Sequence, residues 1–121
     1  MTISERATAA SRTRLITDDE LDKALDWLRD HAAAIGSAKA RLIRAERMIG
    51  HIEALMTLAS AQTSDMKRKA DARSSQRYID AINEEAEAAG EYETMRSLRE
   101  AAALKIEAWR TEAANYRAMK V

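Results

Sequence analysis

Glutamates within residues 80–93 are the side chains whose type and spacing come closest to metal or acid–base chemistry. Glu84, Glu87 and Glu91 recur at i, i+3 and i+7, so they share one face of a helix. A di-metal site in a helical bundle also needs inward-facing acids and a Glu-x-x-His motif. No histidine follows these glutamates, and we interpret them as a solvated acidic face.

The two histidines, His31 and His51, also fail to form a site. On one helix they would lie about 30 Å apart, too far to share a metal ion. His31 falls within an apolar stripe, where a polar residue can set helix register. The chain has no cysteine, no glycine-rich phosphate loop and no Ser-His-Asp set. We therefore expect no enzyme activity, no metal and no cofactor.

Basic side chains gather in residues 67–77 and form the candidate nucleic-acid site. Lysine and arginine neutralise phosphates, and Tyr78 follows closely enough for base stacking. Five bases near a turn are also an ordinary solvated surface, and aromatic residues do not interleave with them. The candidate residues are Lys67, Arg68, Lys69, Arg73 and Arg77.

An apolar stripe with alternating spacings of three and four predicts one long helix over about residues 18–70. Its members are Leu21, Ala24, Leu28, Ile35, Ala38, Leu42, Ala45, Ile49, Ile52, Met56 and Ala59. Thr17 and Glu20 fit a capping box at the start of this helix. The phase does not change at Gly36 or Gly50, so we favour a continuous helix, with a break near Gly36 as the alternative. A stripe this narrow needs a partner helix.

Residues 71–75 are the predicted turn, and Ser74 or Ser75 can cap a second helix over about residues 76–118. The expected second stripe is Tyr78, Ile82, Ala86, Ala89, Tyr92, Met95, Leu98, Ala102, Ile106, Trp109, Ala113 and Tyr116. These elements predict an all-α, coiled-coil-like antiparallel hairpin over residues 17–121, preceded by a flexible tail at residues 1–16.

If the chain reverses direction at about residue 72, the sequence also predicts which charged segments lie side by side. The acidic residues 18–30 would lie beside Arg110, Arg117 and Lys120. The basic residues 39–47 would lie beside residues 95–103, which carry Arg96 and Arg99. The second pairing is repulsive, so we expect a basic band to stay exposed.

The composition favours self-association. Alanine occupies 26 of 121 positions, there is no phenylalanine, and aromatic residues make up 4% of the chain. At roughly 25 cal/mol per Å² of buried apolar area, an alanine-rich two-helix seam is only marginally stable. Trp27, Ala34, Met48 and Leu55 form a second apolar row beside the seam. We therefore expect a homo-oligomeric bundle, with seam residues Leu21, Leu28, Ile35, Leu42, Ile49, Ile52, Met56, Ile106 and Trp109.

The start of the chain lacks the apolar stretch of a secretory signal, and a transit peptide is the weaker alternative. No apolar run approaches the roughly 20 residues needed to cross a bilayer. We expect a cytoplasmic protein, in a bacterium or in the cytosol of a host, without a membrane partner.

Two segments carry a resemblance to a known group of proteins. Glu107-Ala108-Trp109-Arg110 is followed by Asn115-Tyr116-Arg117-Ala118-Met119-Lys120, and residues 19–28 read Asp-Glu-Leu-Asp-x-Ala-Leu-Asp-x-Leu. Together they resemble small uncharacterised helical proteins of tailed bacteriophages and prophages, over about a third of the chain. The resemblance implies a setting in phage DNA metabolism, because such genes tend to lie among those for recombination and replication. It implies no activity.

In the predicted hairpin these two segments meet at the end that holds the termini. The candidate partner-binding residues there are Asn115, Tyr116, Arg117, Met119 and Lys120. We expect a non-enzymatic protein that self-associates and binds a protein of phage or host DNA metabolism. The alternatives are direct nucleic-acid binding through the basic residues 67–77, and inhibition of a host defence complex.

Overall fold

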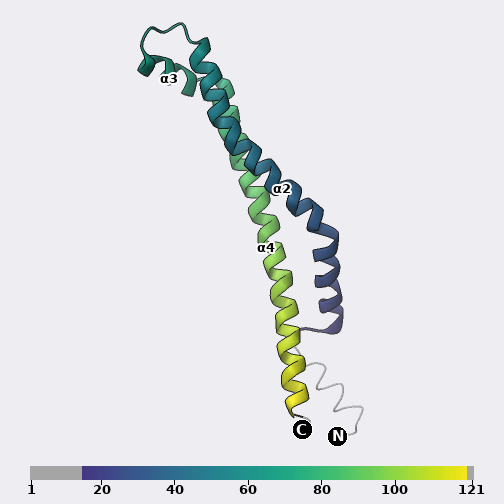
Figure 1. Cartoon of the computed structure of the whole chain (residues 1–121). Helices are drawn as coiled ribbons and strands as arrows, with labels where there is room; N and C mark the ends of the chain where they lie inside the picture. The colour runs from purple at the N-terminus through teal and green to yellow at the C-terminus, as the bar shows by residue number, and fades with distance from the viewer. Residues whose placement is uncertain (1–14, 120–121) are drawn as a thin grey trace. The chain divides into compact units, whose positions relative to one another are not determined.

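The computed structural model describes residues 15–119 as three helices and, within that range, no strand. Helix α2 spans Asp18–Ala59, α3 spans Asp65–Arg73 and α4 spans Gln76–Met119, as labelled in Figure 1. The two long helices, α2 and α4, pack against each other, which confirms the predicted all-α hairpin. Residues 1–14 of the expected tail and Lys120 of the expected partner site lie outside the described residues.

The predicted capping box starts α2. The Glu20 amide donates to Thr17 Oγ1 at 3.1 Å, and the Thr17 amide donates to Glu20 Oε2 at 3.4 Å. This exchange gives partners to two backbone donors near the start of the helix. The helix then continues through Gly36 and Gly50 without interruption.

Helix α2 ends at Ala59, not near residue 70 as expected. Residues 60–64 are rich in serine, threonine and glutamine, whose side chains offer the backbone partners other than a helix. Ser60 Oγ accepts from the Gln62 amide at 3.2 Å and donates to Asp71 Oδ2 at 2.7 Å. Ser64 then accepts from the Lys67 amide at 3.2 Å, which caps a new helix.

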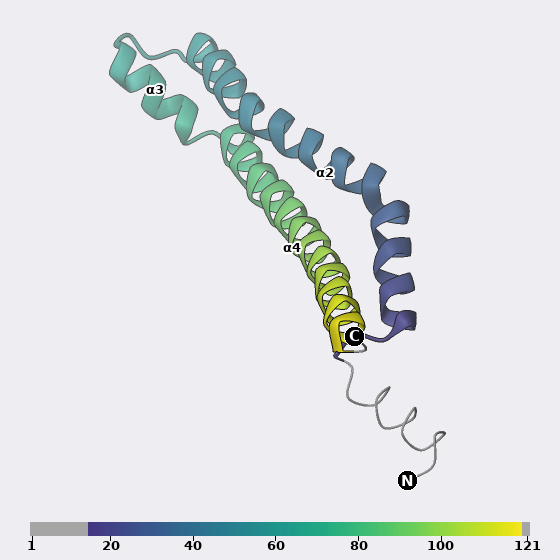
Figure 2. The ribbon, with the colours of Figure 1, turned by 60° about the horizontal axis from the view of Figure 1, so that its bottom comes forward.

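Helix α3 connects the end of α2 to the start of α4, as Figure 2 shows. Its one buried residue is Ala72, with 1% of its surface exposed. The next helix begins after Ser75, whose hydroxyl accepts from the Tyr78 amide at 3.2 Å. Of the two serines expected to cap this helix, Ser75 therefore provides the hydroxyl.

The described residues fall into two compact units, each of which contains one stretch of α2 and one of α4, and the second of which also contains α3. The first contains residues 15–32 and 97–119, and the second contains residues 33–96. The second unit holds a core of Leu42, Ala45 and Ala88, against which Ala89 and Tyr92 pack. Because α3 lies between α2 and α4 in the chain, the two long helices pair in a different register from the one expected. Residues 39–47 of α2 lie opposite residues 84–92 of α4. The expected repulsive pairing with residues 95–103 was wrong.

The apolar stripe of α2 faces inward along its length. Every member is buried or half-buried except Ala59, the last residue of the helix, and His31 is half-buried within the stripe. In α4 the inward face agrees with the expected one at most positions and differs from it at four. Its buried or half-buried positions with three-four spacing are Tyr78, Ala81, Glu85, Ala88, Tyr92, Met95, Ala102, Ile106, Trp109 and Ala113.

Four residues expected in the second stripe, Ile82, Ala86, Leu98 and Tyr116, are exposed instead. Alanine at positions 81 and 88 lets the helices approach closely, and Ala88 is completely buried. Of the ten buried apolar residues in the described range, seven are alanine. The seam is therefore thin, and many large apolar side chains remain at the surface.

Candidate functional site

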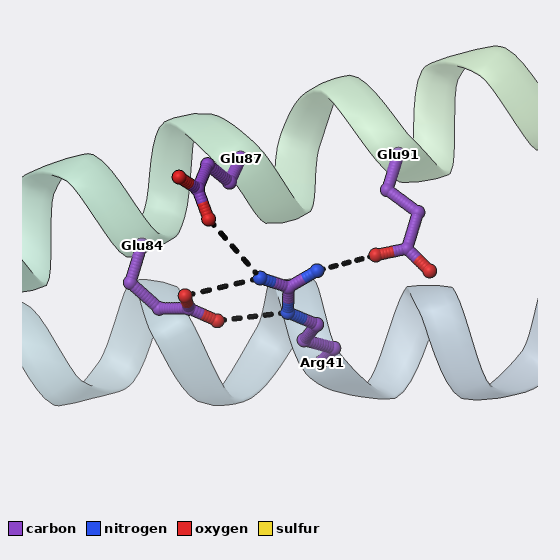
Figure 3. A network of polar contacts seen from close by, with 4 residues as sticks. All are labelled: Arg41, Glu84, Glu87 and Glu91. Carbon is purple, nitrogen blue, oxygen red and sulfur yellow. Dashed lines mark hydrogen bonds and ion pairs between the residues drawn. The ribbon is translucent and has the colours of Figure 1, made fainter.

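Arg41 of α2 forms a polar network with three glutamates of α4 (Figure 3). Its Nε and Nη2 donate to the two carboxylate oxygens of Glu84 at 2.8 and 3.0 Å. Its Nη1 donates to Glu91, and Nη2 lies 3.6 Å from Glu87 Oε2. The glutamates that we interpreted as a solvated acidic face therefore bind an arginine across the helix pair.

This network joins α2 to α4 in one register. The hydrogen bonds from Arg41 lower the pKa of Glu84 below its usual range, and hydrogen bonds to Glu84 and Glu91 raise the pKa of Arg41. All four side chains are partly exposed, so each pair contributes little to stability. The bidentate geometry nevertheless favours the pairing that places Arg41 beside Glu84.

The lowered pKa of Glu84 predicts a pH dependence. The Glu84 carboxylate binds a proton more readily in the unfolded chain than in the folded one. The stabilisation that its contact with Arg41 provides is therefore complete above the ordinary glutamate pKa of about 4.3. It is lost as the pH falls through the lower pKa of the folded state. Thermal melts should show that Arg41→Met loses less stability between about pH 6 and about pH 3 than the unmodified chain. An equal loss in both proteins would contradict this.

The basic cluster of residues 67–77 lies on α3 and the first turn of α4. Two of its members have partners: Arg68 Nε donates to the Gln62 carbonyl at 2.8 Å, and Arg73 lies 3.2 Å from Glu53. Lys67, Lys69 and Arg77 are exposed, and no ion pair joins them to any residue between 15 and 119. These three cations are thus available to an external anion.

Apolar side chains stand beside these cations. Met66 of α3 and Leu58 near the end of α2 are each 81% exposed. Leu58 and Lys69 line an open groove of about 440 Å³ together with Glu53 and Ala54. Tyr78 is half-buried, so its ring is less available for base stacking than the sequence suggested.

The first unit joins the start of α2 to the last turns of α4. Trp109 Nε1 donates to Asp18 Oδ1 at 2.9 Å, and the Leu15 amide donates to Glu112 Oε1 at 2.8 Å. The acidic start of α2 therefore lies beside the segment that contains Arg110, as expected, although Arg110 itself pairs with Glu107 of its own helix at 3.1 Å. The contacts between the two segments thus include an indole donor and a carboxylate that accepts from backbone amides.

The candidate partner-binding residues that the structure describes lie on the exposed last turns of α4. Asn115, Tyr116, Arg117 and Met119 are exposed, Met119 at 85%. The seam residues Leu21, Leu28, Ile106 and Trp109 are half-buried in this same unit. The other predicted seam residues, Ile35, Leu42, Ile49, Ile52 and Met56, are buried or half-buried in the second unit.

Sequence reasoning missed a groove in the first unit, which we call the lysine-rimmed groove. It has a volume of about 210 Å³ and is lined by Lys23, Ala24, Trp27, Leu98, Ala101, Ala102 and Lys105. Trp27 is held in place by His31, whose ring stacks on the indole with centroids 4.4 Å apart. The exposed apolar row containing Trp27 was visible in the sequence, but Leu98 was expected in the seam, so the groove was not predicted.

Two further kinds of feature, a metal-binding group and a membrane-spanning helix, are not found in the described part of the chain. Between residues 15 and 119, no three His, Asp or Glu side chains are grouped so that they could hold a metal ion. None of the three helices is long and apolar enough to cross a membrane. Comparison of the chain with protein-family models, with curated proteins and with solved structures found no match.

Proposed function

We propose that this chain is a non-enzymatic helical interaction protein that self-associates and binds another protein. The distribution of apolar side chains carries this proposal. The buried residues are mostly alanine, whereas Leu25, Met48, Ile82 and Leu98 are between 43% and 48% exposed. A fold that hides small residues and presents large ones gains most from further helix contacts.

The resemblance to phage proteins supplies the proposed setting. Both segments that carry it lie in the first unit, where Trp109 and Asp18 bind each other. Tyr116 and Met119 extend the same helix with exposed apolar surface. We propose a partner from phage or host DNA metabolism, and a host defence complex as a further candidate partner.

Self-association predicts a mass above that of the monomer. Because the seam is thin and large apolar side chains surround it, we expect a dimer or tetramer at micromolar concentration. Sedimentation equilibrium measures this directly, and a monomer mass across the micromolar range would contradict the proposal. A dilution series should show the monomer only at lower concentration.

Direct nucleic-acid binding is the second candidate function, and the three cations without ion pairs favour it. Lys67 and Lys69 on α3 and Arg77 on α4 can each contact a phosphate. If all three contact duplex DNA, affinity should fall roughly 40-fold between about 50 and 200 mM salt. Fluorescence anisotropy with labelled DNA measures both the affinity and its salt slope.

A matched pair of triple variants tests this function. Replacing Lys67, Lys69 and Arg77 by glutamine should abolish DNA binding. Replacing Arg29, Arg110 and Arg117 by glutamine removes the same charge from the first unit and should leave binding nearly unchanged. No binding by the unmodified chain at about 50 mM salt, or equal losses in both variants, would exclude the α3 site.

A further inference from the structure

Helix α4 has a second helical face in the first unit, apart from the inward one. The inward face there contains Ala102, Ile106, Trp109 and Ala113. The second face repeats every seven residues, in the a and d positions of a heptad: Ala101, Leu104, Ala108, Thr111 and Asn115. All of these are exposed except the half-buried Ala108, and Leu104 is 70% exposed. Leu104 therefore leaves most of its apolar surface to water.

Charged residues flank this second face at the positions that pair in coiled coils. With Ala101 at a and Leu104 at d, Glu100 stands at g and Lys105 at e. In a parallel helix pair, a g residue meets the e residue that lies five positions later in the partner, and Glu100 and Lys105 are five apart. Lys105 is exposed and has no ion pair with any residue between 15 and 119. A second copy in parallel orientation would place a carboxylate beside each of these lysines.

The same charges distinguish the two orientations in which a second copy could pack. In an antiparallel pair, e positions face e positions and g positions face g positions, so Lys105 would meet Lys105 and Glu100 would meet Glu100. In a parallel pair each lysine meets a glutamate, and such e and g pairs set orientation in coiled coils. Asn115 stands at an a position, where a single asparagine specifies register and oligomeric state.

We propose that two copies of the chain pair α4 with α4 in parallel, through residues 100–115. Leu104 of each copy then enters the hole formed by four residues of the other copy, which are Ala101, Leu104, Lys105 and Ala108. Ala101 and Lys105 also line the lysine-rimmed groove, so the leucine of the second copy covers one edge of that groove. This inference rests on the proposed self-association and names the surface responsible for it.

Both copies use the same face, so the contact is isologous and closes as a two-fold dimer. Each copy contributes one leucine, and the other a and d residues are small or polar, so the contact buries little apolar area. Glu107 at g and Glu112 at e repel across the pair, although Glu107 is paired with Arg110 and Glu112 accepts from the Leu15 amide. A small contact with mixed charges fits association in the micromolar range rather than a permanent dimer.

Disulfide cross-linking tests the contact, because the chain has no cysteine of its own. Ala101→Cys places a thiol at an a position, and Ala103→Cys is the control, since Ala103 is equally exposed but lies outside the paired face. Under mild oxidation we expect Ala101→Cys to form a covalent dimer at least about tenfold faster than Ala103→Cys. A mixture of Ala101→Cys and Asn115→Cys should give few mixed dimers, because these positions lie about 20 Å apart in a parallel pair.

Charge exchange gives a second readout. Lys105→Glu should lower the association constant roughly tenfold, because both glutamate–lysine pairs of the dimer become repulsive. Adding Glu100→Lys to the same chain exchanges the two charges and should restore association. Arg99→Glu is the control, since it makes the same change in net charge at an exposed position outside the pair. Circular dichroism should show unchanged helix content in all of these variants, because the substituted side chains are exposed.

The outcomes separate this proposal from the one on which it rests. Selective cross-linking of Ala101→Cys, together with recovery of association in the charge-exchanged chain, supports parallel pairing of α4. If the unmodified chain self-associates but Ala101→Cys and Ala103→Cys cross-link equally, or the exchange restores nothing, the contact is overturned and self-association stands. Mixed dimers of Ala101→Cys with Asn115→Cys, formed as fast as the Ala101→Cys dimer, also overturn it. If sedimentation shows only monomer in the micromolar range, both proposals fail.

Discussion

Leu42→Asp is expected to destabilise the second unit strongly. Leu42 is 9% exposed and packs with Ala45 and Ala88 in the core. The substitution removes a buried apolar side chain and places a carboxylate where the core residues offer no cation. Together these changes should lower the free energy of unfolding by about 3 kcal/mol or more. A thermal melt by circular dichroism should show a melting temperature lower by about 10 °C or more.

The neighbouring residue provides the control. Ile43→Asp introduces the same charge one position later, but Ile43 is 36% exposed, so the carboxylate stays in water. We expect a change of less than about 1 kcal/mol from this variant. Equal destabilisation by the two substitutions would mean that Leu42 does not face the core. Leu42→Asp should also lower any oligomer mass, because the surfaces for association depend on the folded hairpin.

Ala88→Leu is the second large effect that we expect, and it tests the register of α4. Ala88 is completely buried against Leu42 and Ala45, so three added carbon atoms have no space. Overpacking of this kind costs about 1–3 kcal/mol. For a chain of this size that corresponds to a melting temperature lower by roughly 5 °C or more.

Ala86→Leu is the matched control for this substitution. Ala86 lies two residues earlier on the same helix and is exposed, so the larger side chain projects into solvent. Its effect should lie within about 0.5 kcal/mol of zero. If Ala86→Leu destabilised the chain more than Ala88→Leu, the inward face of α4 would instead be the one that contains Ile82 and Ala86.

Self-association and nucleic-acid binding use different residues, so they can be tested independently. The exposed apolar side chains that carry the proposed self-association are Leu25, Met48, Ile82 and Leu98, whereas the candidate nucleic-acid site has three cations without an ion pair to any residue between 15 and 119, namely Lys67, Lys69 and Arg77. A variant that lost its cations but kept its oligomer mass would separate the two activities. Salt should weaken DNA binding steeply. Self-association through apolar side chains should respond less to salt, because burial of apolar surface is not screened by ions.

The sequence predicted correctly those features of the fold that depend only on residues close together along one helix. The capping box of Thr17 and Glu20 needs only neighbouring residues, and it forms as predicted. The three-four stripe from Leu21 to Met56 faces inward because helix geometry alone brings those positions to one side. Gly36 and Gly50 do not interrupt α2, since the stripe keeps its phase across both.

The end of α2 was harder to predict. Helix formation competes there with hydrogen bonds between polar side chains and the backbone. The segment from Ser60 to Ser64 contains no glycine or proline, so nothing in it forbids a helix. Contacts from outside the segment decide the outcome: Ser60 binds Asp71, and Gln62 accepts from Arg68. These partners lie on α3 and become available only when the chain has already turned.

The sequence by itself determined an all-helical chain, the inward face of α2 and the caps of two of its helices, because all of these follow from spacing along one helix. Only the tertiary structure decided the register of α4. Ala88 and Ala86 are equally plausible seam residues by type, and packing against Leu42 and Ala45 selects Ala88. That choice brings Glu84 and Glu91 to Arg41 and leaves Ile82 exposed. The lysine-rimmed groove also depends on the tertiary structure, because α2 and α4 each supply only part of its lining residues.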